Sequence, residues 1–297
     1  MLPDFLPAAA TAIEEPAAIA LLAQLQQQAI ATPLRIAPLK TVYAKTHGDR
    51  PPLLLLPGFD SSLLEFRRLW PHFIDRQAAW ALDLHGFGFN ERPADVPYTP
   101  DAIRAHLYAT WQSVIQEPVI LAGASMGGAA ALDFARHYPD AVRGLILLDS
   151  AGIAPGPVLG RFLFPPLGYL ATEFLRQPGV RASISRTAYF DPSLATPDAD
   201  RCAALHLAIP GWSRALAAFT KSGSYGSYRR QLPALRQPTL ILWGENDKIL
   251  GTQPAHLFAQ LLPNSCLHWV KACGHVPHLE QPDVVAAAML AFCDRLR

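Results

Sequence analysis

The chain has 297 residues, 51% hydrophobic and 16% charged, which is enough for one large α/β domain with an insertion or for two small domains. Its 25 basic and 24 acidic residues give a formal net charge of +1, so the charge balance offers no basis for nucleic-acid binding and no such partner is expected. No apolar run reaches the roughly 18 residues of a membrane span, no basic residue precedes Arg35, and the four cysteines form no C-x-x-C pair, so we expect a non-secreted protein with reduced thiols in a cytoplasmic-type compartment.

Residues 1–33 are interpreted as an N-terminal helical segment. A helix is expected over 11–30, because Pro16 suits a first helical turn and small or apolar residues recur at helical spacing further on. They are Ala18, Leu21, Leu22, Leu25 and Ala29. The polar face of this helix carries Gln rather than Lys or Arg, which favours packing on the edge of a domain over binding to a membrane interface.

Residues 34–150 and 237–297 predict an α/β core. Short apolar runs predict strands at 53–57, 78–83, 118–123, 142–150, 239–244 and 266–271. Helices are expected between them at 61–73, 101–114, 130–138, 254–262 and 283–296. Wholly apolar strands that alternate with amphipathic helices are typical of a parallel sheet covered on both faces.

Residues 151–236 interrupt this alternation. They are rich in proline, aromatic residues and arginine, and they predict helical pieces without a clear strand. The segment carries 10 basic and 4 acidic residues, which leaves 15 basic and 20 acidic residues for the rest of the chain. We interpret this basic, apolar insertion as a helical cap over the active-site end of the sheet.

Ser125 lies in the pentapeptide Gly123-Ala124-Ser125-Met126-Gly127, a G-x-S-x-G pattern that follows an expected strand and precedes an expected helix. This strand–turn–helix context is the one that a nucleophilic serine elbow requires. A helix that begins here supplies free backbone N–H groups and the positive end of its dipole, both of which stabilise an oxyanion. The alternative is a turn of small residues between a strand and a helix.

A nucleophilic serine needs a base, and the order expected in such folds is Ser, then an acid, then His. Asp247 follows the strand 239–244 and His275 precedes the last helix, so both are expected at the carboxyl edge of the sheet. His275 would take the proton of Ser125, and Asp247 would orient the imidazole. Asp149 is the alternative acid. His278 is the alternative base, although a local hydrogen bond is its ordinary role.

The oxyanion hole is expected to use two backbone N–H groups, from Met126 and from Phe59. Phe59 lies in LLPGFDSS, the loop after the first core strand, where Gly58 lets the chain pass close to the site. An ordinary strand-to-helix turn remains the alternative for this loop.

These motifs resemble the α/β-hydrolase family from about residue 40 to the end of the chain. PGFDSS, DLHGFGFNERP, GASMGG, LILWGENDKI and GHVPHLEQP stand in the family order and at the family spacing. The resemblance implies an eight-stranded, mostly parallel sheet flanked by helices, with a cap inserted after the strand that follows the elbow helix. It also implies that neither a catalytic cofactor nor a metal is needed.

A narrower resemblance is to the chlorophyll dephytylase group of photosynthetic organisms. LLLLPGFDSSLLEFRRLWP, QPTLILWGENDKI, CGHVPHLEQP and LHLAIPGWSRALAAFTKSGSY carry it. It implies hydrolysis of the phytyl ester of chlorophyll to chlorophyllide and phytol, and a setting at the thylakoid membrane. Pro57 departs from the pattern, because many relatives have His before this glycine, which puts the shape of the oxyanion loop in doubt.

The cap contains RFLFPPLGYLATEFL, an apolar stretch suited to a lipophilic ester. It is expected to line a substrate pocket or to rest on a membrane, where its flanking arginines would favour an anionic surface. Its members Phe162, Phe164, Leu167, Tyr169 and Phe174 are the candidate substrate-binding residues. The alternative is that they form the core of the cap itself.

The sequence leaves several activities open. A serine esterase acting on chlorophyll or a related lipophilic ester is the first. A broader carboxylesterase, another reaction of the fold such as C–C hydrolysis or cofactor-free peroxidation, and a non-catalytic small-molecule receptor are the alternatives.

Overall fold

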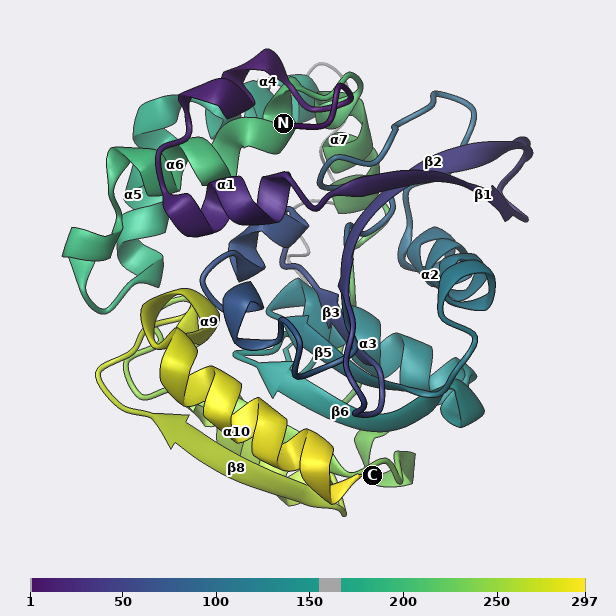
Figure 1. The fold of residues 1–297 in the computed structure, drawn as a ribbon, viewed down its shortest axis with the longest axis vertical. Coiled ribbons are helices and arrows are strands. Elements are labelled where there is room, and N and C mark those ends of the chain that lie inside the picture. Colours follow the sequence, from purple (N-terminus) through teal and green to yellow (C-terminus); the bar gives the residue numbers. More distant parts are fainter. Residues whose placement is uncertain (1, 155–166, 297) are drawn as a thin grey trace.

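The computed structural model describes residues 2–154 and 167–296, and its centre is one eight-stranded sheet (Figure 1). The strand order is β1-β2-β4-β3-β5-β6-β7-β8. Strand β2 runs antiparallel to β1 and β4, and all the other neighbouring strands are parallel, which confirms the predicted mostly parallel sheet. The strands are β1 (Gln26–Thr32), β2 (Arg35–Thr46), β3 (Leu53–Leu56), β4 (Ala79–Leu82), β5 (Val119–Ala124), β6 (Val142–Leu148), β7 (Thr239–Gly244) and β8 (Ser265–Val270).

Both faces of the central strands are buried, because successive side chains of a strand point to opposite sides. In β3, Leu54 and Leu56 join one hydrophobic cluster, whereas Leu53 and Leu55 join the other. The first cluster includes residues of α2 (Pro100–Val114), α3 (Met126–His137) and α8 (Gln253–Leu261). The second includes residues of α1 (Pro16–Leu22) and α10 (Pro282–Arg295). This double burial explains why these strands are continuous apolar runs.

The N-terminal helix is shorter than expected. Helix α1 ends at Leu22, and residues 26–30 of the predicted helix lie in strand β1. Strand β1 is an edge strand that pairs with β2 from Gln26 to Thr32, and most of its side chains are exposed. Backbone pairing in a hairpin thus outweighs the helix propensity of the glutamines.

The helix predicted over 61–73 is also different in the structure. Two short 3₁₀ helices, η2 (Leu63–Phe66) and η3 (Trp70–His72), replace it. Ser62 accepts a hydrogen bond from Leu64 N as the N-cap of η2. Pro71 has no N–H to donate, so it would break a continuous helix over 61–73, but it is tolerated in the first turn of η3.

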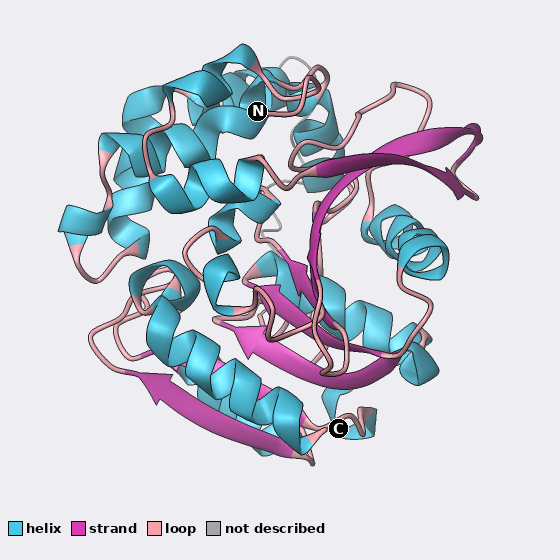
Figure 2. Cartoon of the chain, in the orientation of Figure 1, coloured by secondary structure: helices cyan, strands magenta, loops and turns pink. Residues whose placement is uncertain are grey.

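The described part of the chain between β6 and β7 consists of helices joined by loops and contains no strand, as the cap hypothesis requires (Figure 2). Its helices are α4 (Leu167–Arg176), α5 (Pro178–Ala188), α6 (Pro197–Ala204) and α7 (Trp212–Lys221). They lie beside α1 and the residues that precede it, on one side of the molecule (Figure 1). The limits of the cap at 151 and 236 and of the N-terminal segment at 33 remain interpretations. None of the described helices combines the length and the hydropathy that a membrane crossing needs.

Candidate active site

Ser125 stands alone between the end of β5 at Ala124 and the start of α3 at Met126. Its backbone has φ 49° and ψ −115°, a conformation that non-glycine residues rarely adopt. Hydrogen bonds with the adjoining segment hold it there, since Ser125 N donates to Leu148 O at 2.9 Å and Ala151 N donates to Ser125 O at 2.9 Å. The turn places Ser125 on the wall of a cavity.

The two glycines of the pentapeptide allow this turn because the backbones around it lie very close together. A Cβ on Gly123 would collide with the backbone of Gly127 and Gly128. A Cβ on Gly127 would collide with the carbonyl groups of Leu56 and Pro57. The G-x-S-x-G pattern is therefore explained by backbone contact with helix α3 and strand β3.

His275 and Asp247 meet as the sequence predicted. Nδ1 of His275 lies 2.9 Å from Oδ2 of Asp247, and both side chains are buried. The other carboxylate oxygen, Oδ1, accepts hydrogen bonds from Ile249 N at 2.7 Å and Leu250 N at 3.0 Å. Burial raises the pKa of Asp247, but the hydrogen bond and charge of His275 and these two backbone donors together hold the pKa below its ordinary value. Asp247 is thus a fixed carboxylate that orients the imidazole.

Asp149, the alternative acid, lies close to this pair, with side-chain ligand atoms of all three residues within 4.8 Å of one another. Its carboxylate accepts a hydrogen bond from Gly244 N at 3.0 Å. Burial and the neighbouring charge of Asp247 raise the pKa of Asp149 well above its ordinary value, which favours the protonated form of this carboxyl group. The hydrogen bond to the imidazole is made by Asp247.

The loop 57–62 approaches Ser125 from the end of β3. Gly58 N donates a hydrogen bond to the carboxylate of Glu65 at 3.1 Å, which holds this loop against the core. The N–H of Met126 lies in the first turn of α3, where the helix itself offers no acceptor. Phe59 lines the same cavity as Ser125, and its ring contacts Phe87 with centroids 6.0 Å apart. Both predicted oxyanion donors therefore belong to segments that border the nucleophile.

The cavity beside Ser125 has a volume of about 320 Å³ and is also lined by His275. Cap residues of α5 and α6 close it on one side, and apolar contributions come from Leu175, Ile184 and Ala188. No sequence signal identified these cap residues, because only the packing of the cap on the core brings them to Ser125.

The five predicted substrate-binding residues fare differently. Phe162 and Phe164 lie outside the described residues, and Leu167 and Tyr169 begin α4 with side chains that are likewise outside the description. Phe174 is 58% exposed and is not among the described residues that line the cavity, so its predicted place in the pocket is wrong. It lies on the outer surface of the amphipathic helix α4, which explains why an apolar sequence alone misplaced it.

The core side of the cavity is polar, which the sequence did not reveal. Glu65, Arg67 and His278 line it, and all three are buried or nearly so. Burial raises the pKa of Glu65 to about 7, although Ser61 and Gly58 N favour its charged form. Burial lowers the pKa of His278 to about 3, so its ring is neutral. Neither ring nitrogen of His278 makes a hydrogen bond to a described residue, contrary to the local hydrogen bond expected for it.

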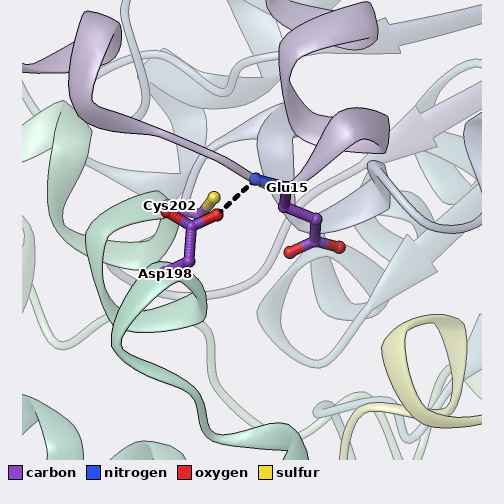
Figure 3. A group of neighbouring side chains, drawn as sticks. All are labelled: Glu15, Asp198 and Cys202. Carbon is purple, nitrogen blue, oxygen red and sulfur yellow. Dashed lines mark hydrogen bonds between the residues drawn. The ribbon is translucent and has the colours of Figure 1, made fainter.

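Two groups of side chains in the described part of the chain have ligand atoms close enough to hold a metal ion. One is Asp149, Asp247 and His275, in which Asp247 is already hydrogen-bonded to His275 and Asp149 accepts from Gly244 N. The other is Glu15, Asp198 and Cys202 (Figure 3). Arg67 and Arg68 neutralise Glu15 there, and burial raises the pKa of the Cys202 thiol to about 11, so this second group is a poor set of metal ligands.

The chain is similar in sequence and in fold to known hydrolases. A family model described as alpha/beta hydrolase fold matches residues 51–282. The chain is 31% identical to the alpha/beta hydrolase domain-containing protein VTE7 of Arabidopsis thaliana, over 82% of this chain and 74% of that protein. It is 28% identical to a 2-hydroxy-6-oxo-2,4-heptadienoate hydrolase of Pseudomonas putida, over 79% and 86% of the two chains. Among solved structures, a thermophilic esterase from Thermogutta terrifontis superposes with a TM-score of 0.77 at 25% identity, covering 91% of this chain and 99% of the other.

Proposed function

The chain belongs to the alpha/beta hydrolase family, and from this premise we propose that it is a serine hydrolase that cleaves a carboxylic ester through an acyl-enzyme. The observation that carries the proposal is the 2.9 Å hydrogen bond between His275 and Asp247 in a cavity that Ser125 also lines. Such a serine, imidazole and carboxylate set is the general device for acyl transfer.

The mechanism follows from the position of each group. The imidazole of His275 takes the proton of the Ser125 hydroxyl while Oγ attacks the ester carbonyl, and the carbonyl oxygen becomes negatively charged. The N–H groups of Met126 and Phe59 stabilise that oxyanion. Protonated His275 then gives its proton to the departing alcohol, and Asp247 stabilises the imidazolium meanwhile. Water releases the acid from Ser125 by the same steps, so no cofactor takes part in this sequence.

We propose further that the substrate is a lipophilic ester and that the phytyl ester of chlorophyll is the first to test. The dephytylase-like motifs support this choice, together with the apolar cap residues at the cavity. The products would be chlorophyllide and phytol. A C–C hydrolase is the second candidate, because the chain resembles a dienoate hydrolase and the core side of its cavity is polar.

The experiment compares wild type with Ser125→Ala on three substrates: chlorophyll, a short aryl ester and a dienoic C–C substrate. We expect phytol release by wild type and a loss of about 10³-fold or more in the variant. Hydrolysis of the aryl ester without any action on chlorophyll would remove the dephytylase proposal and leave a broader esterase. Tight binding of chlorophyll without turnover or a burst would identify a receptor instead.

We also propose that the protein works at the surface of a membrane, the thylakoid membrane in the dephytylase case, with the cap facing the lipid. The support is the charge of the cap segment, with 10 basic and 4 acidic residues, together with the exposed apolar side chains Leu170, Phe174 and Ile184. Basic surfaces are attracted to anionic lipids, and apolar side chains add partition energy.

A further inference from the structure

Helix α5 of the cap is fastened to the core beside two parts of the proposed catalytic machinery. Near its start, Nη1 of Arg181 lies 2.7 Å from Oδ2 of Asp60, the residue that follows Phe59. At its end, the carbonyl oxygen of Ala188 accepts a hydrogen bond of 2.7 Å from the backbone N–H of His275. The same helix thus contacts both the oxyanion loop and the loop that carries the base.

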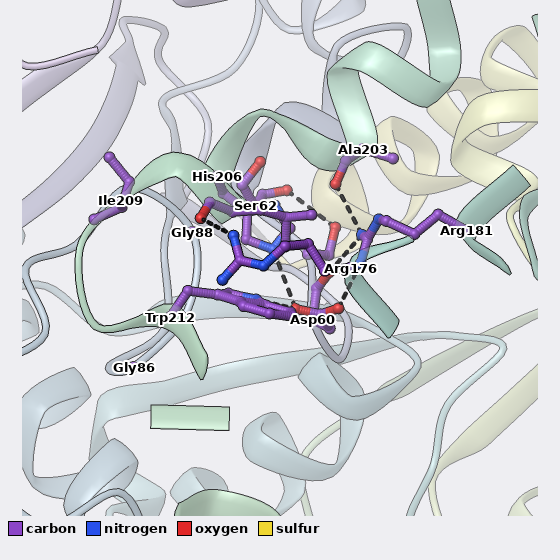
Figure 4. A network of polar contacts seen from close by, with 12 residues as sticks. Asp60, Ser62, Gly86, Gly88, Arg176, Arg181, Ala203, His206, Ile209 and Trp212 are labelled. Atoms are coloured by element: carbon purple, nitrogen blue, oxygen red, sulfur yellow. Dashed lines mark hydrogen bonds and ion pairs between the residues drawn. The ribbon is translucent and has the colours of Figure 1, made fainter. Parts of the chain in front are cut away.

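Asp60 is the centre of a network of cap residues (Figure 4). Its Oδ1 accepts a hydrogen bond from Trp212 Nε1 at 2.7 Å and lies 3.2 Å from His206 Nε2. Arg181 also donates to the carbonyl oxygen of Ala203 at 3.0 Å, so the guanidinium joins α6 to the core as well. Three separate cap elements therefore converge on one carboxylate of the core.

The environment of Asp60 keeps this carboxylate ionised. Its side chain is only 10% exposed. Burial raises the pKa of Asp60, but the hydrogen bond and charge of His206 and the charge of Arg181 hold it at about 2. Burial lowers the pKa of His206 although Asp60 opposes this, whereas the guanidinium of Arg181 stays charged at any ordinary pH. Removing either member of this pair would leave a largely buried charge without its partner.

The backbone of Asp60 is strained in addition. Its φ of 50° lies in the left-handed region, which costs free energy for any residue with a side chain. Such a conformation persists where surrounding contacts fix it. The core holds the neighbours Gly58 and Ser61, and the contacts of the Asp60 side chain come from the cap. The shape of the loop that carries Phe59 thus depends on the seating of α5.

We propose that α5 is a positioning element that sets the separation between the oxyanion loop and the base, with Asp60 and Arg181 as positioning residues. The proposal rests on the proposed function. From Arg181 to Ala188 the helix rises by about 10 Å, and a hydrogen-bonded helix of this length is stiff. Its residues Ile184 and Ser185 line the cavity between the two contacts. A substrate in this cavity would therefore contact α5, the helix that holds both the oxyanion loop and the loop of His275.

The kinetic test uses Asp60→Asn, Arg181→Gln and the double variant, with Arg186→Gln as the matched control. Arg186 is an exposed arginine of the same helix. The Asp60→Asn change keeps an acceptor for Trp212 but removes the charge that Arg181 requires. We expect kcat for a short aryl ester to fall about 10- to 100-fold in each single variant, because a displaced oxyanion donor is worth up to about 10²–10³ in kcat. KM should change much less, and the control should keep wild-type kcat.

The double variant tests whether the two residues act as one link. We expect its loss of kcat to be about that of one single variant, because either change already breaks the same contact. Affinity for an arylboronic acid, which forms a tetrahedral adduct with serine, should fall in parallel with kcat. Wild-type kcat and boronic acid affinity in folded Asp60→Asn and Arg181→Gln proteins would overturn the proposal, whatever the change in their melting temperatures.

A readout without catalysis separates this proposal from the proposed function. Hydrogen exchange of the backbone N–H groups of residues 58–62 should become faster in Arg181→Gln and stay unchanged in Arg186→Gln. Equal exchange in both variants would overturn the link between α5 and the loop. Full activity of Ser125→Ala would overturn the serine mechanism instead, and the exchange result would still stand on its own.

Discussion

Replacing Asp247 or Asp149, the two buried aspartates near His275, by asparagine should affect catalysis to different extents. Asp247→Asn removes the charge that orients and stabilises the imidazole, so we expect kcat to fall by about 10³- to 10⁴-fold. Burial and the charge of Asp247 raise the pKa of Asp149, so its charged form is disfavoured, and an asparagine would still accept the hydrogen bond from Gly244 N. We therefore expect Asp149→Asn to lose less than tenfold. Steady-state kinetics on one ester decides between them, and the reverse ranking would make Asp149 the acid.

Glu65 predicts a pH dependence of stability. Its pKa is raised from an ordinary 4.5 to about 7, chiefly by burial. In that window the unfolded carboxyl is ionised while the folded one keeps its proton, so the folded state binds more protons and stability falls as pH rises, by at most about 1.4 kcal/mol per pH unit. Glu65→Gln keeps an acceptor for Gly58 N and should remove this contribution.

The measurement is urea unfolding of wild type and Glu65→Gln between pH 5 and 7. The free energy of unfolding of wild type should fall more steeply with pH than that of the variant. Glu173→Gln is the control, because Glu173 is largely exposed on α4. Parallel slopes for wild type and Glu65→Gln would show that Glu65 titrates normally.

At the scale of residues, the sequence predicted the groups that belong to local motifs and missed those that depend on distant contacts. Ser125, Asp247 and His275 each follow a strand within a recognisable pattern, and the structure brings the last two together. Asp60 and Glu65 stand in the quoted loop and helix, but nothing local marks their roles. Asp60 meets Trp212, which lies 152 positions further along the chain, and a single sequence carries no sign of that pairing.

At the scale of elements, apolar runs predicted the central strands well because both faces of the sheet are covered. The N-terminal strand was missed, since its exposed glutamines resemble a polar helix face and only pairing with β2 makes it a strand. Segments held by single contacts are equally hard to predict. Helix α1 is one of them. The residue before it, Glu15, is held by ion pairs with two arginines of the core and by a hydrogen bond to Asp198 of the cap domain.

Glu15 at the start of α1 predicts a stability effect. Its carboxylate pairs with Arg67 at 2.8 Å and Arg68 at 2.7 Å. Its backbone N–H donates to Asp198 at 2.6 Å, as Figure 3 shows. Arg67 is 3% exposed, so Glu15→Ala would leave a buried charge without its partner and should cost about 3 kcal/mol. Glu14→Ala, at the exposed neighbouring position, should cost less than about 0.5 kcal/mol. Urea unfolding measures both, and equal losses would refute the role assigned to the ion pairs.

At the scale of the whole molecule, charge is divided between two regions. The cap segment holds 10 basic and 4 acidic residues, whereas the rest of the chain holds 15 and 20. Large apolar side chains are also exposed on the cap, with Leu170 at 62% and Phe174 at 58%. An anionic surface would therefore attract the cap and repel the core, so we expect a bound molecule to turn its cap towards the lipid.

Vesicle flotation tests this orientation with two matched variants. Phe174→Ser removes an exposed ring from the cap, and Ile36→Ser removes a fully exposed side chain from the β1–β2 hairpin of the core. We expect wild type to bind anionic vesicles more strongly than neutral ones and to be released by salt, since the attraction is screened. Full burial of an aromatic side chain is worth about 1.5–3 kcal/mol, so Phe174→Ser should weaken binding by about tenfold or more. Ile36→Ser should bind like wild type. Equal losses in the two variants, or equal binding to neutral vesicles, would show that the cap does not face the membrane.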